Sequence, residues 1–372
     1  MKKRVGLIVN PIAGMGGRVG LKGTDGPEIL RKSVALGAVP VSCGRASQAL
    51  KSLSAMGAGF HLFTYPREMG EDAATESGLE ATTLGSIRSG ATTAEDTERA
   101  ARDLAAAGVD LLLFAGGDGT ARNICRGVGD RLPVLGIPAG VKMHSAVFGT
   151  TPARAGAAAA LFLRGRIRET RDAEVMDIDE GAFREQRLSA RLYGYLRVPA
   201  EPRMVQAVKA GGSAGEASAV RGIALHVAAT MDPGCCYLIG PGTTTREIME
   251  VLGLPNTLLG VDVVLDRSLV ACDVNEGQVL EVVGRRPARI VVGVIGGQGY
   301  LFGRGNQQIS DRVIARVGKE NIIVVACRSK LFALGGRPLL VDTGNGEVDR
   351  MLAGYVQVIT GLKEKLVYPV EC

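Results

Sequence analysis

The sequence predicts an α/β protein: an N-terminal parallel-sheet domain over residues 1–150, then a mixed, partly antiparallel α/β domain over residues 151–372. In the first half, short apolar runs end in glycine-rich turns and lead into helical patterns, which is the pattern of parallel strands with helical crossovers. After Arg171 the apolar residues alternate as in antiparallel strands. The chain has 52 glycines, about twice the ~7% background, and tight turns between strands and helices account for the excess. An alternative arrangement returns the C-terminal segment to the first domain.

Composition restricts the class of protein. Hydrophobic residues make up 46% and charged residues 22% of the chain, as in a globular protein with a core. The net charge of +6 suits an anionic ligand, but with 4% aromatic residues and no Trp a nucleic-acid partner is not expected. The apolar run after the first residues is too short for a signal peptide, and no run approaches a membrane span. We expect a soluble cytoplasmic protein with reduced cysteines, no membrane partner and a homo-oligomeric assembly.

The first half divides into regular elements in chain order. A capping box at Thr93 and Asp96 begins one of its helices. The stretch 66–90 has no clear period and is expected to be an exposed excursion or a short strand pair. Predicted strands cover 5–9, 60–64, 109–115 and the residues from 133, and predicted helices cover 27–37, 45–57, 93–107, the residues from Thr120, and 152–163.

The second half begins with alternating strands at 174–179 and 187–198, followed by a Gly/Ser-rich turn at 209–215. His61 and His226 both fall in predicted strands, so we expect them in the core or on a sheet face. Further strands are predicted at 222–230, 237–239, 288–297 and 321–326.

The turn Gly116-Gly-Asp-Gly119 is the strongest chemical signal. Its three glycines allow backbone N–H groups and the N-terminus of the next helix to approach an anion closely. Asp118 then places one carboxylate beside a phosphate-sized space, where it could take a proton or hold a metal. No Walker A motif and no clean G-x-G-x-x-G after a strand is found, so a P-loop enzyme and a Rossmann dehydrogenase lose their main support. The turn favours phosphoryl transfer.

Three further glycine-rich strand exits, at 10–17, 136–145 and 240–246, would meet the first one if their strands are parallel neighbours. The loop at 21–26 could neutralise phosphate through Lys22 and bind Mg²⁺ through Asp25, which we group with Asp118 as candidate metal ligands. The basic cluster of Arg164, Arg166, Arg168 and Arg171 forms either a solvated helix end or a contact with phosphate or an acidic partner. The candidate ligand-binding residues are Asn10, Pro11, Gly14, Gly16, Gly17, Lys22, Asp25, Gly116, Gly117, Gly119, Thr120, Asn123, Gly140, Lys142, His144, Ser145, Gly240, Gly242, Thr243, Thr244, Thr245, Arg246, Gly297, Arg304 and Asn306.

These motifs resemble the ATP-NAD kinase family, which shares its nucleotide-binding design with diacylglycerol and sphingosine kinases. The resemblance covers essentially the whole chain and is closest to the acetoin-catabolism X branch. The residues that carry it are Asn10-Pro11, Leu21–Gly26, Gly116–Thr120, Gly136–Ser145, Gly240–Thr245 and Phe302–Gln308.

The resemblance implies a Mg²⁺-dependent transferase that uses ATP to phosphorylate NAD to NADP, with Asp118 as the essential acid and the glycines at nucleotide phosphates. NAD kinases follow their glycine turn with an Asn-acid pair that grips the NAD ribose; here Asn123 precedes Ile124, and an Asn-Glu pair occurs at Asn275-Glu276. A kinase for another hydroxyl metabolite or a lipid, and a non-catalytic nucleotide-binding regulator, are the alternatives.

Overall fold

The structure is a computed structural model that describes residues 2–21, 23, 26–178, 190–206, 216–284 and 286–372. The chain forms two compact units, Met1–Met15 with Gly23–Val208, and Gly16–Lys22 with Lys209–Cys372. Within these described ranges, no helix is long and apolar enough to cross a membrane.

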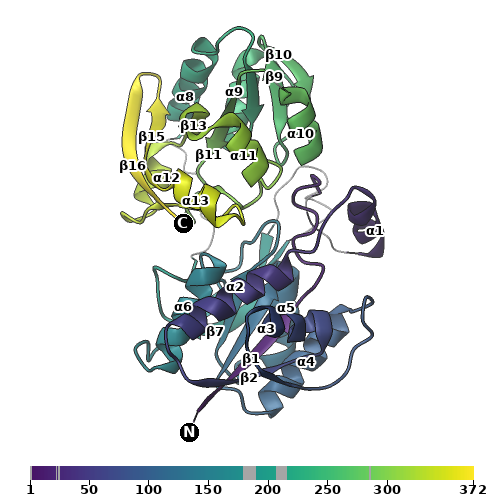
Figure 1. Cartoon of the computed structure of the whole chain (residues 1–372). Coiled ribbons are helices and arrows are strands. Elements are labelled where there is room, and N and C mark those ends of the chain that lie inside the picture. The colour runs from purple at the N-terminus through teal and green to yellow at the C-terminus, as the bar shows by residue number, and fades with distance from the viewer. Residues whose placement is uncertain (1, 22, 24–25, 179–189, 207–215, 285) are drawn as a thin grey trace. The chain divides into compact units, whose positions relative to one another are not determined.

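The first unit is built on a five-stranded parallel sheet in the order β3-β2-β1-β4-β5. Two of its strands, β1 and β2, are labelled in Figure 1. From β1 the chain moves outward through β2 to β3, and from β4 it moves the other way to β5. The strand order therefore reverses between β1 and β4, which is where ligands bind in open α/β sheets. The parallel sheet predicted from the sequence is confirmed. Its strands are β1 Lys3–Val9, β2 Phe60–Thr64, β3 Ala81–Thr83, β4 Leu111–Gly116 and β5 Val134–Pro138.

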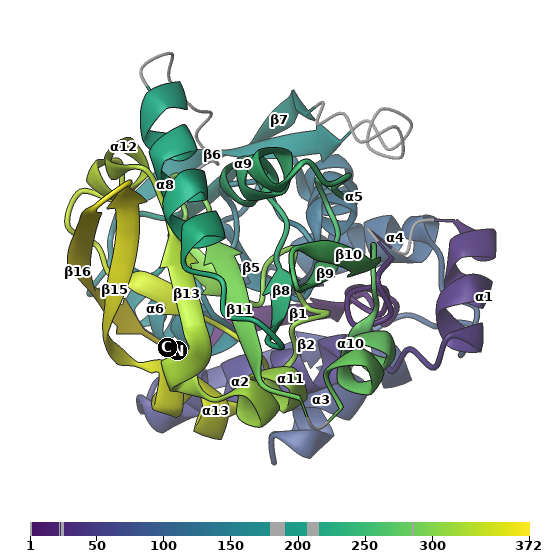
Figure 2. The ribbon, with the colours of Figure 1, turned by 90° about the horizontal axis from the view of Figure 1, so that it is seen from above.

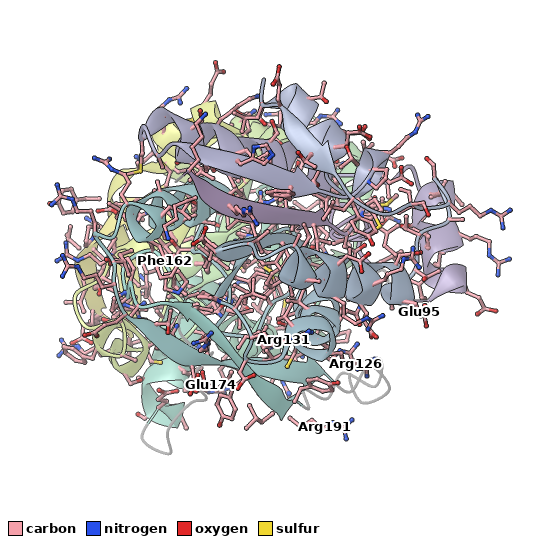
Figure 3. The ribbon with its side chains drawn as sticks, turned by 90° about the horizontal axis from the view of Figure 1, so that it is seen from below. Glu95, Arg126, Arg131, Phe162, Glu174 and Arg191 are labelled. Carbon is pink, nitrogen blue, oxygen red and sulfur yellow. The ribbon has the colours of Figure 1, made fainter. Side chains whose placement is uncertain are left out.

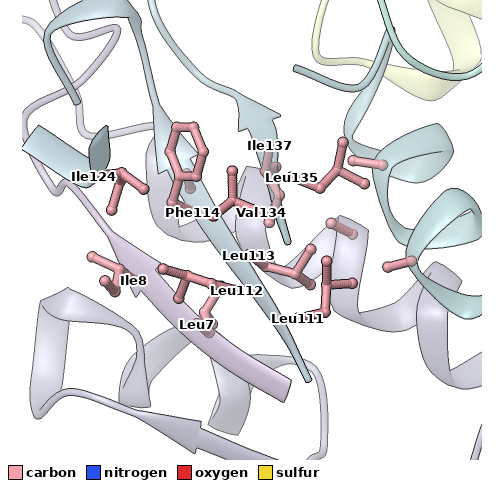
Figure 4. Close-up of a cluster of buried hydrophobic side chains, with 14 of the residues drawn as sticks. Leu7, Ile8, Leu111, Leu112, Leu113, Phe114, Ile124, Val134, Leu135 and Ile137 are labelled. Atoms are coloured by element: carbon pink, nitrogen blue, oxygen red, sulfur yellow. The ribbon is translucent and has the colours of Figure 1, made fainter. Parts of the chain in front are cut away.

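Helices cover both faces of this sheet. Helices α2 and α6 pack together on one face, and α4 and α5 pack together on the other (Figure 2). The central strands are consequently buried on both sides, and Leu111–Phe114 of β4 are fully buried beside Leu7 and Ile8 of β1 (Figure 4). The helices are α1 Pro27–Ala35, α2 Ser42–Ala55, η1 Arg67–Met69, α3 Glu71–Glu76, α4 Ala94–Ala106, α5 Asp118–Val128 and α6 Pro152–Leu163.

Two details of the first half bear on the predictions. The capping box at Thr93 and Asp96 is present at the start of α4. Residues 66–90 are neither an excursion nor a strand pair, because they form η1, α3 and β3, and β3 extends the parallel sheet beside β2. The three residues of β3 were too short to give a strand pattern in the sequence.

Strands β6 (Thr170–Ile178) and β7 (Ala190–Pro199) form the predicted antiparallel pair. This ribbon contacts α5 and β5 of the first unit. Arg126 of α5, labelled in Figure 3, donates from Nε to the Tyr193 hydroxyl of β7 over 2.6 Å, and its guanidinium lies over the Tyr193 ring. The compact units therefore divide after Val208 and not at the expected boundary of 150/151, since α6 and the ribbon pack with the first sheet. The predicted turn at 209–215 lies outside the described residues.

The second unit contains a nine-stranded mixed sheet in the order β10-β9-β8-β11-β13-β15-β16-β14-β12. Strands β8, β11, β13 and β15 are parallel neighbours, whereas β9, β10 and the β15–β16 pair run antiparallel. The expected mixed, partly antiparallel sheet is confirmed. The C-terminal strands β14, β15 and β16 belong to this sheet. The strands are β8 Cys236–Ile239, β9 Asp262–Leu265, β10 Ser268–Ala271, β11 Ala288–Gly293, β12 Tyr300–Phe302, β13 Ile322–Val325, β14 Leu339–Val341, β15 Gly354–Gly361 and β16 Glu364–Glu371.

The central strands of the second sheet are also buried on both faces. Ile290 and Val292 of β11 join one apolar cluster with helices α10 and α11, whereas Val291 joins another with α8 and α9. The prediction of a strand at 222–230 is wrong, because these residues lie in α8, and His226 is a helical residue. Alanine-rich apolar runs of this length fit either element. The helices are α8 Ala217–Ala229, α9 Thr243–Leu252, α10 Glu276–Val283, α11 Asp311–Val317, η2 Lys319–Asn321, α12 Arg328–Phe332 and α13 Gly346–Leu352.

Candidate functional site

The candidate site lies at the carboxyl ends of β1 and β4, where the strand order reverses. The first residue after β1, Asn10, donates its backbone N–H to the Ala115 carbonyl of β4 over 2.9 Å. Its side-chain Nδ2 donates to the Thr120 hydroxyl of α5 over 2.9 Å. Asn10 and Thr120 therefore connect the two strand exits on either side of the reversal point, and Pro11 follows half-buried.

Helix α5 begins at Asp118, two residues earlier than the sequence indicated. The carboxylate therefore belongs to the first turn of the helix. Gly117 occupies the N-cap position, and no described side chain caps the helix. The first N–H groups of an α-helix have no intrahelical partner, so this terminus presents backbone donors and the positive end of the helix dipole. Such an arrangement binds anions.

The Asp118 carboxylate is buried and held by the turn after β5. Its Oδ2 accepts the His144 backbone N–H over 2.8 Å, and its Oδ1 accepts the Ser145 backbone N–H over 3.0 Å. The His144 ring lies beside it, with Nδ1 3.5 Å from Oδ2. Asp118, His144 and Ser145, predicted separately, thus form one cluster. The carboxylate has a fixed orientation, because each oxygen is held by a separate backbone donor.

The glycines of these turns allow three backbone segments to pack closely. A Cβ at Gly140 would lie 2.8 Å from the Gly117 Cα, and a Cβ at Gly14 would lie 2.0 Å from the Ala139 carbonyl oxygen. Gly14 also has a φ of 81°, which only glycine adopts without strain. The backbone N–H groups of Ala139 and Gly140 both donate to the Gly116 carbonyl. The exits of β1, β4 and β5 therefore meet as expected, and several of their glycines serve this packing directly.

Residues without a motif hold the β5 turn in place. The Arg45 Nε donates to the Pro138 carbonyl, and the Gln206 side-chain amide donates to the Ser145 carbonyl. Arg171 donates to the carbonyls of Ala146 and Gln206, both over 3.2 Å, so this member of the basic cluster supports the turn. Arg45 and Gln206 were missed, because only tertiary packing places them here. The remaining first-unit candidates are Gly119, Asn123 and Lys142, which are half-buried.

The metal expectation rests on Asp118 and Asp25. Asp25 and Lys22 lie outside the described residues. Among the described residues, no three His, Cys, Asp or Glu side chains gather as a metal site. Asp118 alone, the one described candidate ligand, does not fit a magnesium site built by the protein alone, because such an ion needs several oxygen ligands. The assignment of Asp118 and Asp25 to a metal stays a prediction.

Gly16 and Gly17, from the end of the first exit, belong to the second unit. A Cβ at Gly17 would lie 3.0 Å from the Gln307 side chain. The next residue, Arg18, pairs with Asp311 over 2.7 Å and with Glu276 over 3.5 Å. These contacts are structural within the second unit.

The glycine-rich exit of β8 also opens a helix. The Gly240 N–H donates to the Val291 carbonyl, and Gly242 is the N-cap of α9 with a φ of 132°. Thr244 and Thr245 are buried, whereas Thr243 is exposed. Lys330, which we did not predict, donates from Nζ to the Thr244 hydroxyl over 2.9 Å.

Arg246 is turned to its own helix, where its Nε donates to Glu250 over 2.7 Å. The exit of β8 belongs to the sheet of the second unit. A site shared by this exit and the three exits of the first unit therefore stays a prediction.

The segments around Gly297, Arg304 and Asn306 form a buried polar cluster in the second unit. Arg304 pairs with Asp342 over 2.8 Å and lies over the Tyr300 ring at 4.6 Å. Burial opposes the charge of Arg304, but the Asp342 carboxylate raises its pKa above the ordinary arginine value. Asn306 donates to the Leu301 carbonyl over 2.7 Å, and the Gly297 carbonyl accepts from Arg337. These contacts stabilise the loops, and a ligand role for Gly297, Arg304 and Asn306 stays a prediction.

Comparison with known families decides the class of the chain. The family model of the ATP-NAD kinase N-terminal domain matches residues 5–167, and that of the ATP-NAD kinase C-terminal domain matches residues 245–370. The chain belongs to the ATP-NAD kinase family. The N-terminal match contains the first sheet, apart from Lys3 and Arg4 of β1, and the Asp118 turn, whereas Gly240 and Gly242 precede the C-terminal match. The chain is thus a member of a kinase family.

Other comparisons add little to this assignment. Two solved structures from Bacillus anthracis str. Sterne, with titles that describe a diacylglycerol kinase, match with 20% and 19% identity and TM-scores of 0.26 and 0.25. Each match covers 48% of this chain, and 46% and 48% of the respective relatives, so the chain spans about half the length of the solved relatives it matches. These likenesses carry no argument about the chain. A search of curated proteins found no match.

Proposed function

We propose that this member of the ATP-NAD kinase family is an ATP-dependent kinase that phosphorylates a hydroxyl of NAD and forms NADP. The observation that carries the proposal is the uncapped N-terminus of α5 at the reversal point of the first sheet, with the Asp118 carboxylate fixed in its first turn. Phosphoryl transfer depends mainly on positioning and on stabilisation of charge. Both need rigid donors, and the packed turns after β1, β4 and β5 supply a rigid backbone.

Each part of the site has a role in this proposal. The N–H groups of the first turn of α5 bind phosphate oxygens of ATP, because they are donors at a helix N-terminus. Lys142, half-buried on the β5 turn, is the described cation nearest in sequence to His144 and Ser145. Asp118 keeps the β5 turn in the orientation that the transfer requires. Magnesium would arrive with the triphosphate and neutralise its charge, as is usual for this ion in kinases.

A specific observation keeps a second candidate open for the acceptor. Asn123 is followed by Ile124, so α5 lacks the Asn-acid pair of NAD kinases. The Asn275-Glu276 pair is used otherwise: Asn275 caps α10 in a capping box with Gln278, and Glu276 accepts the Ser310 hydroxyl. A kinase for another hydroxyl metabolite or a lipid is therefore the alternative, together with a regulator that binds nucleotides without turnover.

The test is an acceptor screen with the purified full-length chain. The protein is incubated with ATP and magnesium and with NAD, NADH or a panel of hydroxyl metabolites and diacylglycerol, and ADP and phosphorylated products are measured by mass spectrometry. ADP and NADP formed together support the proposal. ADP formed with another acceptor only would replace NAD as substrate. Calorimetric binding of ATP without ADP formation with any acceptor would favour the regulator.

A further inference from the structure

His144 is a buried side chain whose ring nitrogens have no hydrogen-bond partner. It lies on the turn after β5, and its side chain is 6% exposed. Neither Nδ1 nor Nε2 makes a hydrogen bond with any described residue. Buried polar side-chain atoms are nearly always hydrogen-bonded, so a ring left in this state calls for a ligand or another specific explanation.

The nearby Asp118 carboxylate favours the ring tautomer with the proton on Nδ1. Nδ1 lies 3.5 Å from Oδ2, just beyond hydrogen-bond distance, and Oδ2 also accepts the backbone N–H of His144 itself. An ionised carboxylate only accepts hydrogen bonds, so a neutral ring beside it places its proton on Nδ1. Nε2 is then left with a lone pair and acts as a hydrogen-bond acceptor.

A second acceptor without a donor reaches the same turn from the segment after β7. Gln206 is 1% exposed, and its Nε2 amide group donates to the Ser145 carbonyl over 2.5 Å. The Gln206 Oε1 has no hydrogen-bond partner among the described residues. His144 Nε2 and Gln206 Oε1 are thus two hydrogen-bond acceptors without a donor among the described residues. Fully ionised phosphate oxygens are acceptors too and cannot satisfy them, whereas hydroxyl groups can.

We propose that His144 positions the phosphoryl acceptor: Asp118 holds the ring with its proton on Nδ1, and Nε2 accepts a hydrogen bond from a hydroxyl group of the substrate. The proposal rests on the proposed kinase function but not on the identity of the acceptor as NAD. It assigns His144, which the sequence marked only as a candidate ligand-binding residue, to the hydroxyl side of the site. It also gives Asp118 a defined task, which is to orient the ring and the turn.

The ring state can be measured directly and without turnover. The chain has only three histidines, His61, His144 and His226, so the side-chain nitrogens of ¹⁵N-histidine-labelled full-length protein can be assigned with the H144Q variant. At mildly alkaline pH we expect the His144 ring in the Nδ1–H form, with Nε2 unprotonated. An Nε2–H ring would overturn the proposal, because Nε2 would then be a donor.

Kinetics with two substitutions test the contact with the substrate. H144Q places an amide oxygen near the position of Nε2, whereas H144L fills the space with no acceptor. For H144L we expect kcat/KM for the hydroxyl substrate to fall about 10- to 100-fold, the effect of one lost hydrogen bond to a ligand. The KM for ATP should change by less than about threefold. H144Q should retain the acceptor kcat/KM within about fivefold, which a purely structural role would not predict.

A matched control is H61Q, because His61 is exposed on β2 and bonds only to Thr82 in the described contacts. The inference would be refuted if H144L raised the KM for ATP and the KM for the hydroxyl substrate equally, or if it kept its kcat/KM for the hydroxyl substrate within about threefold. In both cases the wild-type protein would still transfer phosphate, so the proposed function would be unaffected. Absence of phosphoryl transfer by the wild type with every acceptor would instead refute the proposed function, and the inference with it.

Discussion

The substitution Asp118→Asn tests the central feature of the site with one atom changed. Each carboxylate oxygen accepts a backbone N–H from the β5 turn, at 2.8 Å from His144 and 3.0 Å from Ser145. An asparagine side chain has one oxygen and one NH₂ group. In either orientation of the amide, one backbone N–H therefore faces another donor, and the turn must move away from α5.

The cost follows from the hydrogen bonds involved. A hydrogen bond to a charged group contributes about 1.5–3 kcal/mol, and at least one is replaced by a donor-donor contact. The free energy of unfolding should fall by about 1.5–3 kcal/mol. For a unit of this size that corresponds to a fall in Tm of about 3–12 °C. A displaced turn should also lower phosphoryl transfer by about 100-fold or more, because small misplacements in a site have effects of that size.

Scanning calorimetry and the ATP-dependent assay measure the two effects. The matched control is D130N, since Asp130 is exposed in the turn after α5 and the same substitution there should change neither quantity. If D118N melts within about 1 °C of wild type and keeps its turnover, the backbone hydrogen bonds of Asp118 do not support the site as argued.

Three further predictions concern packing, pH and thiol chemistry. G140A should lower the free energy of unfolding by about 1–3 kcal/mol in urea titration, because its Cβ would lie 2.8 Å from the Gly117 Cα. The control G44A, with open space at its Cβ, should be neutral or stabilising, and equal stabilities of the two variants would contradict the packing argument. Burial opposes the charge of Asp96, but the Thr93 backbone N–H and Arg99 lower its pKa. Wild-type stability should therefore fall as pH drops below about 4, and D96N should lose this part of the acid dependence. Parallel curves of stability against pH for the two proteins would show that the capping box contributes nothing. Burial and Glu76 raise the pKa of the Cys43 thiol to about 11. Iodoacetamide near neutral pH should therefore label the exposed cysteines well before Cys43, as measured by mass spectrometry, and simultaneous labelling would contradict the raised pKa.

The sequence predicts elements best where burial enforces a period. The β4 run is almost wholly apolar because the strand is covered on both faces, and it was located within two residues. The Thr93–Asp96 capping box was legible because it depends on residues three apart. Residues 222–230 were misassigned, because a run of alanine and β-branched residues fits a buried strand as well as a helix, and only the partners in the fold decide between them.

The candidate site shows the same division between what local patterns predict and what contacts between distant residues decide. By itself the sequence determined the glycine turn, its single carboxylate and the exits of β1 and β5, because turns that need glycine and strands that need burial are local requirements. Only the tertiary structure decided what Asp118 faces, because its partners His144 and Ser145 lie 26 and 27 residues away and approach through the parallel pairing of β4 with β5. The same holds for Arg45 and Gln206, whose side chains reach the β5 turn from distant parts of the chain. Contacts between distant residues depend on the register of the sheet and the packing of its helices, and no local pattern records them.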